Sequence, residues 1–330
     1  MTMLQLRDKW VWDFWFAVDG SDYHIFYLQA DKSLGNPDLR HWNVSVGHAV
    51  SCDLIHWDIL PDALAPTANN DEAPDSFTTW TGSVVRYQNE WLMFYTGTMR
   101  AEKGLIQRVC LARSTDLIHW VKEKQNPIVQ LDERWYDGLK LAYWHDASWR
   151  DPWILFDKDQ NGNDLFHMLI TCRVNRGAPD GRGAIGYASS SNLVDWHVGD
   201  AFLAPGWYGE MEVPQVQYID GRYYLFCSVS TRFHSTLHNE HLDVIPQTGI
   251  KYFVSEQLLG PYETLGNSFL TRPEQNGLYA GRVIQGPDGK WYFMAFLGND
   301  SGGEFQGVII DPIPIAIAAD GTLSLASAAT

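Results

Sequence analysis

The sequence has little that would suit a membrane-bound or nucleic-acid-binding protein. No run approaches the roughly 18 apolar residues that a bilayer-spanning helix requires. Positive charge is scarce, because 24 Lys and Arg stand against 40 Asp and Glu, which gives a formal net charge of −16. Such a surface repels phosphate backbones and anionic lipids. We therefore expect neither a nucleic-acid nor a membrane partner, and we favour a neutral small-molecule ligand.

Three further features are missing. The four cysteines include no Cys-x-x-Cys pair, so nothing indicates a zinc site, and we expect neither a metal nor a cofactor. Residues 1–9 lack both the basic end and the apolar run of a signal peptide, so we expect a cytoplasmic protein, or a secreted one if a leader has been removed. Helical periodicity of useful length is also absent, which favours an all-β fold.

Aromatic residues are abundant instead, with Trp, Tyr and Phe at 15 each. Flat apolar rings suit the cores of β-sheets, and the rings of Trp and Tyr also carry one polar group. The same rings suit clefts that bind sugars, whose ligands present both hydroxyl groups and C–H faces. Core packing accounts for most of these residues, and a carbohydrate is the ligand that the remainder would fit.

The chain repeats a β-hairpin, in which two aromatic-rich strands flank a short polar turn. Three of the turns contain an Asp-Gly pair, at 19–20, 220–221 and 288–289, which is a strong signal for tight hairpins. The five copies span residues 14–29, 82–97, 151–171, 213–230 and 281–298.

A second pattern follows the hairpins, namely a strand and then a Ser-x-Asp-Leu-x-x-Trp turn. It occupies residues 47–57, 109–120 and 185–196, and an altered copy lies at 251–262. A hairpin, this third strand and a fourth after the Trp form one four-stranded sheet. Radial repetition of such sheets is typical of a β-propeller. We predict one catalytic domain, residues 1–330: an all-β, five-bladed β-propeller whose four-stranded antiparallel blades surround a central funnel, with residues 307–325 completing the last blade or closing the ring.

Acidic residues stand where the innermost strands begin, and these positions point into the funnel. Asp13, Asp151 and Glu212 occupy equivalent places in three blades, so their carboxyl groups should converge. Paired carboxyl groups suit glycoside hydrolysis, in which one acts as acid and the other as nucleophile or base. Clustered acids also bind calcium. The Trp residues between them favour the sugar chemistry over the metal.

Several motifs resemble glycoside hydrolase family 32, which includes invertases, inulinases and levanases. The opening VWDFWF (residues 11–16) and GEMEVP (209–214) are similar instead to the levansucrases of family 68 in the same clan. The motifs that resemble family 32 are GHAVSCDLIHWDILPDALAP (47–66), WTGSVV (80–85), FYTG (94–97), RDPWI (150–154) and EVPQV (212–216).

The resemblance implies a five-bladed propeller that cleaves β-fructofuranosides with retention of configuration. By position, Asp13 would be the nucleophile and Glu212 the general acid and base. Asp151, with Arg150 beside it, would hold two hydroxyl groups of the fructosyl ring, and Glu210 would orient a neighbouring arginine. The further residues expected to bind substrate are Trp12, Gln29, Trp80 and Ser83.

Family 32 also has a C-terminal β-sandwich, which we do not expect in these 330 residues, because the five blades account for them. Two other readings stay open. Propellers of families 43 and 62 place two Asp and one Glu similarly and cleave arabinosides or xylosides, and an aromatic-rich propeller can be a non-catalytic carbohydrate-binding module. The particular fructoside, hydrolysis versus fructosyl transfer, and the oligomeric state are not determined by the sequence.

Overall fold

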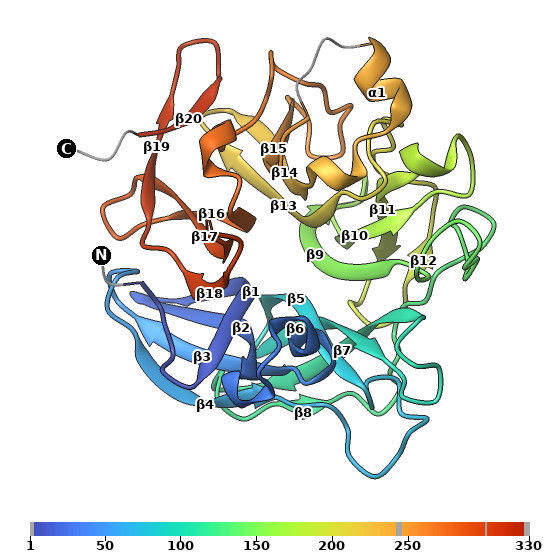
Figure 1. Cartoon of the computed structure of the whole chain (residues 1–330), viewed down its shortest axis with the longest axis vertical. Coiled ribbons are helices and arrows are strands. Elements are labelled where there is room, and N and C mark those ends of the chain that lie inside the picture. The colour runs from blue at the N-terminus through green and yellow to red at the C-terminus, as the bar shows by residue number, and fades with distance from the viewer. Residues whose placement is uncertain (1–2, 242–245, 301, 327–330) are drawn as a thin grey trace.

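The computed structural model describes residues 3–241, 246–300 and 302–326. Its strands form five antiparallel sheets arranged around a central channel (Figure 1). The predicted five-bladed β-propeller is therefore confirmed. Each predicted hairpin forms the two innermost strands of one blade, and each repeat of the second pattern supplies the third strand.

The first three blades have the expected four strands each. The first contains β1 (Lys9–Asp19), β2 (Asp22–Asp31), β3 (Ser45–Ser51) and β4 (Asp58–Leu64). The second contains β5 (Thr78–Tyr87), β6 (Glu90–Thr98), β7 (Gln107–Ser114) and β8 (Val121–Lys122). The third contains β9 (Trp149–Lys158), β10 (Asp164–Arg173), β11 (Gly183–Ser190) and β12 (His197–Val198).

The last two blades vary on this plan. Among the described residues, the fourth blade has three strands: β13 (Glu212–Ile219), β14 (Arg222–Val229) and β15 (Gly249–Ser255). Beyond β15 the described residues form isolated bridges, Val254 to Glu263 and Lys251 to Phe269, instead of a fourth strand. Pro261, which would extend the first of these bridges, has no N–H to donate. The fifth blade contains β16 (Leu278–Gln285), β17 (Trp291–Asn299), β18 (Phe305–Ile309), β19 (Ile313–Ile317) and β20 (Leu323–Leu325).

Residues 307–325 were predicted to complete the last blade or to close the ring, and they do both. Strands β19 and β20 extend the fifth blade, whereas β18 pairs with β17 and packs against β1 of the first blade. Leu4 and Ile309 also form a bridge, with backbone hydrogen bonds of 3.0 and 3.1 Å. The segment before β1 thus pairs with the end of β18, which joins the first blade to the fifth.

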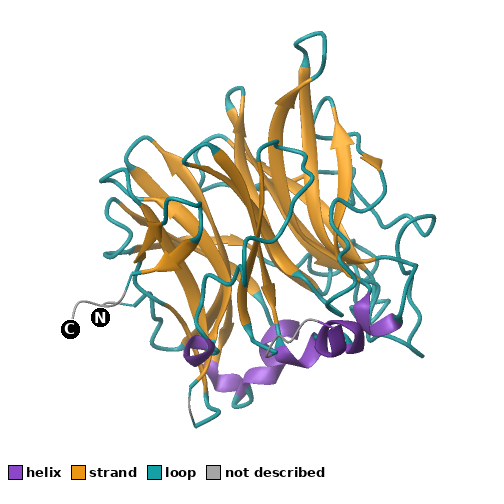
Figure 2. Ribbon diagram, turned by 90° about the horizontal axis from the view of Figure 1, so that it is seen from above, coloured by secondary structure: helices purple, strands orange, loops and turns teal. Residues whose placement is uncertain are grey.

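Helical turns gather along one side of the molecule (Figure 2). Among the described residues no helix is long and apolar enough to cross a membrane. The helical segments are η1 (Lys32–Leu34), η2 (Pro37–Trp42), η3 (Pro179–Gly181), η4 (Thr231–Phe233), α1 (Thr236–His241) and η5 (Pro273–Gln275).

The Ser-x-Asp-Leu turns fill space between sheets, as the repeat predicted. In the first of them, the Asp53 carboxylate accepts hydrogen bonds from the backbone N–H groups of Ile55 and His56. This arrangement supports a left-handed Leu54, whose side chain is buried. In the second, Trp120 packs edge-on against Phe26 of the neighbouring blade.

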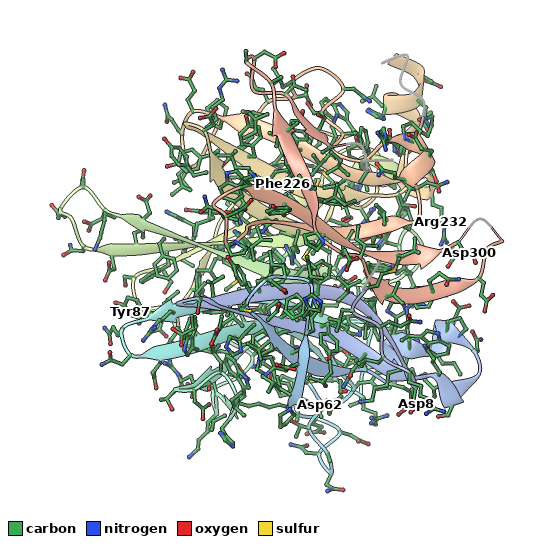
Figure 3. The ribbon with its side chains drawn as sticks, turned by 90° about the vertical axis from the view of Figure 1, so that its left-hand side faces the viewer. Asp8, Asp62, Tyr87, Phe226, Arg232 and Asp300 are labelled. Carbon is green, nitrogen blue, oxygen red and sulfur yellow. The ribbon has the colours of Figure 1, made fainter. Side chains whose placement is uncertain are left out.

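Four apolar cores fill the wedges between neighbouring blades. Phe226, for example, lies buried between the fourth and fifth blades, whereas Asp8, Asp62 and Asp300 lie at the surface (Figure 3). Because apolar area removed from water is the main stabilising term, these wedges hold the blades at fixed angles. The innermost strands therefore present their first residues to the channel in a fixed geometry.

Candidate active site

Each innermost strand carries one extra residue near its start, which interrupts its pairing with the second strand. The irregularity follows Trp12, Trp80, Arg150, Glu212 and Tyr279 in the five blades. A β-bulge bends the strand and re-aims its side chains. Asp151, Val213 and Ala280 adopt positive φ values of 57°, 56° and 46° at these positions. The same backbone device thus turns side chains of several blades into the channel.

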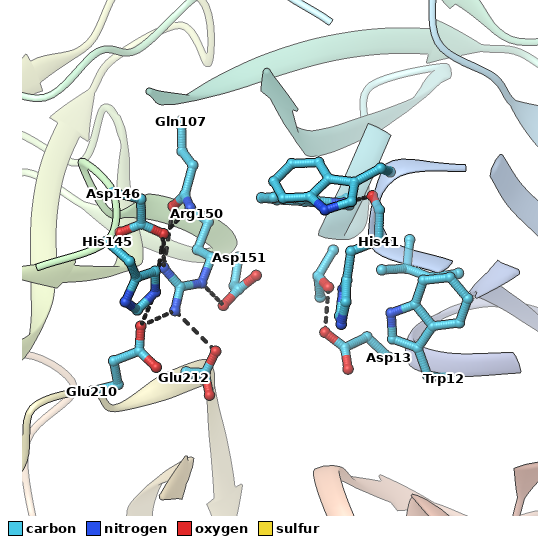
Figure 4. A pocket seen from close by; sticks show the side chains of 14 residues that line it. Trp12, Asp13, His41, Gln107, His145, Asp146, Arg150, Asp151, Glu210 and Glu212 are labelled. Atoms are coloured by element: carbon cyan, nitrogen blue, oxygen red, sulfur yellow. Dashed lines mark hydrogen bonds and ion pairs between the residues drawn. The ribbon is translucent and has the colours of Figure 1, made fainter. Parts of the chain in front are cut away.

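A cavity of about 250 Å³ lies where the first four blades converge. Figure 4 shows Asp13 across this cavity from Asp151 and Glu212. The three predicted carboxyl groups are therefore brought into one small volume. Its lining comprises Trp12, Asp13, Leu28, His41, Trp42, Trp80, Thr81, Gln107, His145, Asp146, Arg150, Asp151, Glu210 and Glu212.

Asp13 lies in the bulge of β1 and faces the cavity. Its Oδ2 accepts a hydrogen bond of 2.6 Å from the Thr81 hydroxyl, which the adjacent blade supplies from its own bulge. Removal from water raises the pKa of Asp13, and the negative charge of Glu212 raises it further. The Thr81 hydrogen bond opposes this rise and fixes the orientation of the carboxyl group.

Arg150 joins the carboxylates of the third and fourth blades. Its Nη2 donates to Glu210 Oε1 at 2.8 Å and to Glu212 Oε1 at 2.9 Å. The other side of the guanidinium is held by Gln107, whose Oε1 accepts from Nη1 at 3.2 Å. Gln107 in turn donates to Asp146 at 2.7 Å. This network fixes Arg150, as the planar guanidinium allows.

Glu212 also has a partner in the fifth blade. The Tyr279 hydroxyl donates a short hydrogen bond to Glu212 Oε2, so each carboxyl oxygen of Glu212 has a donor. Glu210, two residues earlier, is buried, and burial together with the charge of Glu212 raises its pKa to about 8. The two neighbouring glutamates thus have different environments: Glu212 opens to the cavity, whereas Glu210 is withdrawn from water.

Asp151 is buried beside Arg150, with its Oδ2 3.7 Å from Arg150 Nε. The Val213 backbone N–H also donates to this oxygen at 3.2 Å. Burial outweighs the arginine and raises the pKa of Asp151 to about 7, with Asp13 and Glu212 adding to the rise. Close to neutral pH this site therefore holds a carboxyl group that is partly protonated.

This shift predicts that Asp151→Asn becomes more stable relative to the wild type as the pH rises. Between about pH 4 and 7 the unfolded chain has released the proton that folded Asp151 retains, so the contribution of Asp151 to wild-type stability falls across this window. Asparagine does not titrate, so the stability of the variant relative to wild type should grow by up to about 4 kcal/mol. Urea unfolding at several pH values measures this difference.

The control for this prediction is Asp58→Asn, which alters an exposed carboxylate of β4. Its stability relative to wild type should change little with pH. If the difference between Asp151→Asn and wild type were constant from pH 4 to 8, burial of a raised-pKa carboxyl group at this position would be refuted.

The predicted binding residues divide into two groups. Trp12, Trp80, Arg150 and Glu210 line the cavity, and Glu210 contacts Arg150 as the sequence suggested. Gln29 and Ser83 lie outside the lining; both are buried, and Gln29 donates to Ser45 Oγ at 3.1 Å. The pairing register explains the position of Ser83: it follows the bulge, and Trp80 and Thr81, which come before it in β5, line the cavity. A binding role for these two residues stays a prediction.

Sequence reasoning missed several residues of the site. Thr81 and Tyr279 stand at blade entrances, so the position was informative even though neither is acidic. His41, by contrast, lies in η2, where no repeat indicates it; its carbonyl accepts from Trp80 Nε1 at 2.8 Å, and burial lowers the pKa of its ring to about 3. Among the described residues, no three His, Cys, Asp or Glu side chains are placed to hold a metal ion.

Known proteins resemble this chain over its whole length in fold and over part of it in sequence. The β-fructofuranosidase of Bombyx mori is 19% identical, with a TM-score of 0.70, and the match covers 99% of this chain and 64% of that one. The inulosucrase of Halalkalicoccus jeotgali, solved with kestose, is 21% identical, with a TM-score of 0.75, over 97% and 90% of the two chains. These likenesses show the fold.

Among curated relatives, the acid β-fructofuranosidase of Solanum lycopersicum is 38% identical over 147 residues, which are 43% of this chain and 20% of that protein. A sucrose-6-phosphate hydrolase of Zymomonas mobilis is 29% identical over 184 residues, 53% of this chain and 30% of its own. The matched stretches thus span less than a third of these proteins. The model of the glycosyl hydrolases family 32 N-terminal domain matches residues 15–304, and the chain therefore belongs to glycoside hydrolase family 32.

Proposed function

We propose that this protein is a retaining β-fructofuranosidase that hydrolyses fructosides such as sucrose or fructo-oligosaccharides, or transfers their fructosyl group. The observation that carries the proposal is the meeting of Asp13, Asp151 and Glu212, from three blades, in one cavity. Family membership supports the substrate class. The match begins two residues after Asp13, so the assignment of Asp13 depends on its place in the cavity.

In the proposed mechanism, Asp13 Oδ attacks the anomeric carbon of the fructosyl unit. The bond from that carbon to the glycosidic oxygen breaks, and Glu212 donates its proton to the leaving oxygen. The product of this step is a fructosyl ester on Asp13. Thr81 holds the attacking carboxyl group in place, and Arg150 and Tyr279 hold Glu212.

In the second step, Glu212 removes a proton from water or from the hydroxyl group of a second sugar. The oxygen attacks the same carbon, and the ester bond to Asp13 breaks. Hydrolysis and transfer differ only in this acceptor, so the proposed site serves either reaction. Asp151 and Arg150 would hold the ring hydroxyls, and these contacts accelerate the reaction to the extent that they strengthen in the transition state.

The test is release of sugar from a panel containing sucrose, a fructo-oligosaccharide, an aryl α-arabinofuranoside and an aryl β-xyloside. We expect fructose from the first two and no product from the others. Release of arabinose or xylose would favour the chemistry of families 43 and 62. If the folded protein releases no product from any of these four substrates, the result would favour the carbohydrate-binding propeller.

Stereochemistry tests the covalent step separately. Two successive displacements at the same carbon restore its configuration, so fructose should first appear as the β-furanose. Time-resolved NMR distinguishes this anomer before mutarotation. Initial appearance of the inverted anomer would exclude Asp13 as the nucleophile while leaving a fructoside as substrate.

A further inference from the structure

In the fifth blade, an arginine stands near the start of the innermost strand. Arg282 lies in β16 directly after the bulge that follows Tyr279, and only 1% of its surface is exposed. The fifth blade lies between the fourth and the first, and β16 packs against both β13 and β1 (Figure 1). These two strands carry Glu212 and Asp13. The mechanism proposed above gives Arg282 no part.

The guanidinium of Arg282 donates hydrogen bonds to both neighbouring blades. Its Nε donates to the Phe14 carbonyl of β1 at 3.0 Å. Its Nη1 donates to the Pro214 carbonyl of β13 at 3.0 Å and to the Val213 carbonyl at 3.4 Å. All three acceptors belong to the one or two residues that directly follow the proposed nucleophile or the proposed acid and base. One planar group therefore connects the backbone beside the two reacting carboxyl groups.

The bulge of β13 explains why its carbonyl groups need this donor. The pairing register skips Val213 and Pro214, so neither residue has a cross-strand partner in β14. Proline has no N–H, and the Val213 N–H donates to Asp151 Oδ2 at 3.2 Å. Both residues are buried, and buried carbonyl groups require hydrogen bonds. Arg282 supplies these bonds to the segment that follows Glu212.

Arg282 also brings a positive charge to the site. Burial lowers its pKa to about 10, so the guanidinium stays charged near neutral pH, and Asp151 and Asp13 stabilise that charge. In return, Arg282 opposes the burial that raises the pKa of Asp13. A carboxyl group must be ionised to attack as a nucleophile, so this charge favours the reactive form of Asp13.

Other groups also affect the ionisation of Asp13. The negative charge of Glu212 raises the pKa of Asp13, and the Arg40 guanidinium lowers it. Arg40, however, donates to the Pro37 carbonyl of its own helical turn, whereas Arg282 binds the strand of Asp13 itself. The titratable and charged groups that face Asp13 from the surrounding elements are Glu212 of β13, Asp151 of β9, Tyr279 and Arg282 of β16, and Arg40 and His41 of η2.

Arg173 of β10 is a close structural counterpart of Arg282. It is equally buried, its guanidinium also lies over a Trp ring, and burial lowers its pKa to about 10 as well. It also donates to two backbone carbonyl groups, those of Gly209 and Pro179. Neither acceptor adjoins the two reacting carboxyl groups. The two arginines thus share burial and backbone hydrogen bonding, and they differ in their position relative to the reacting pair.

We propose that Arg282 is a positioning residue, which holds the strand of Asp13 at a fixed distance from the strand of Glu212. It lies outside the lining of the catalytic cavity. The inference rests on the proposed function, because it concerns the same pair of carboxyl groups. Double displacement requires roughly 5 to 5.5 Å between such a pair. A misplacement of about 1 Å can cost roughly 100-fold in rate, so loss of Arg282 should act on kcat.

Kinetics on sucrose across a range of pH tests the proposal. Arg282→Met should lower kcat about 100-fold while KM changes less than about threefold. The acid limb of its kcat/KM profile should move to higher pH, because Asp13 loses a neighbouring positive charge. Arg282→Lys keeps the charge without the planar set of donors, so the acid limb should return while kcat stays about 10-fold below wild type. Arg173→Met is the matched control, and should keep the acid limb and a kcat within a few-fold of wild type.

A second measurement needs no turnover. Carbon-13 NMR of labelled aspartate carboxyl groups follows the titration of Asp13, with Asp13→Asn to assign its signal. Arg282→Met should raise the titration midpoint of Asp13, and Arg173→Met should leave it unchanged. If wild type cleaves no fructoside, the proposed function fails, and this midpoint still decides whether Arg282 acts on Asp13: an unchanged midpoint refutes such an action.

Three kinetic results would overturn the proposal: wild-type kcat in folded Arg282→Met, a loss confined to KM, or equal losses in Arg282→Met and Arg173→Met. If Arg282→Met does not fold, Arg282→Lys decides. Wild-type kcat in that variant would show that the charge alone matters and would exclude a positioning role.

Discussion

Asp13→Asn is expected to reduce kcat by roughly 10⁴- to 10⁶-fold, the range seen when a catalytic nucleophile is removed. An amide cannot form the ester, yet its oxygen can still accept the Thr81 hydrogen bond. The fold should therefore persist. Because burial raises the pKa of Asp13, a neutral side chain at this position should not lower the free energy of unfolding.

The measurement is the initial rate of fructose release, with urea unfolding as the check on folding. Asp58→Asn again supplies the control, since it makes the same chemical change on the surface of β4. A folded Asp13→Asn protein with more than a hundredth of wild-type turnover would exclude a covalent role for Asp13. Attack by water on the anomeric carbon would then be the alternative.

Glu212→Gln should cost roughly 10²- to 10⁴-fold in kcat on sucrose, because general acid catalysis typically contributes this much. Fructosyl fluoride needs no proton for departure of its leaving group, so the first step should survive with this substrate. The second step still lacks its base. The fructosyl ester on Asp13 should therefore accumulate, and mass spectrometry of the peptide containing Asp13 detects it.

Glu210→Gln is the matched control. Burial and the charge of Glu212 raise the pKa of Glu210, so a neutral glutamine should be tolerated at this position. Its Oε1 could still accept from Arg150. We expect a change of only a few-fold. Near-normal turnover of sucrose by Glu212→Gln, with severe loss in Glu210→Gln, would reverse the assignment of the two glutamates.

The sequence predicted the blades well because hairpins are local. Asp-Gly turns and alternating aromatic strands determine which segments pair, and the ring follows from five repeats. The fourth blade departs from the four-stranded plan at residues 251–262, where the Asp-Leu-x-x-Trp turn is absent. The sequence itself shows this absence. Asp13, Asp151 and Glu212 were found because acid at equivalent positions of a repeated fold is itself a signal.

The remaining site residues depend on contacts that no local pattern encodes. Gln107 begins a third strand of the second blade, yet it supports Arg150 of the third. His41 and Trp42 come from a short helical turn outside the repeats. The one-residue shift at each bulge decides that Thr81, rather than Ser83, reaches the cavity. Packing between blades determines which of these side chains reach the site, and a single sequence does not reveal that packing.

The bulges also bear on how such a site can change over time. A residue that is extra in its strand has no cross-strand partner of its own, so its replacement disturbs the ladder of hydrogen bonds little. Thr81, Asp151 and Ala280 stand at corresponding points of different blades. Substitutions at these positions can therefore change substrate preference one blade at a time, without altering the packing that sets the angles between blades.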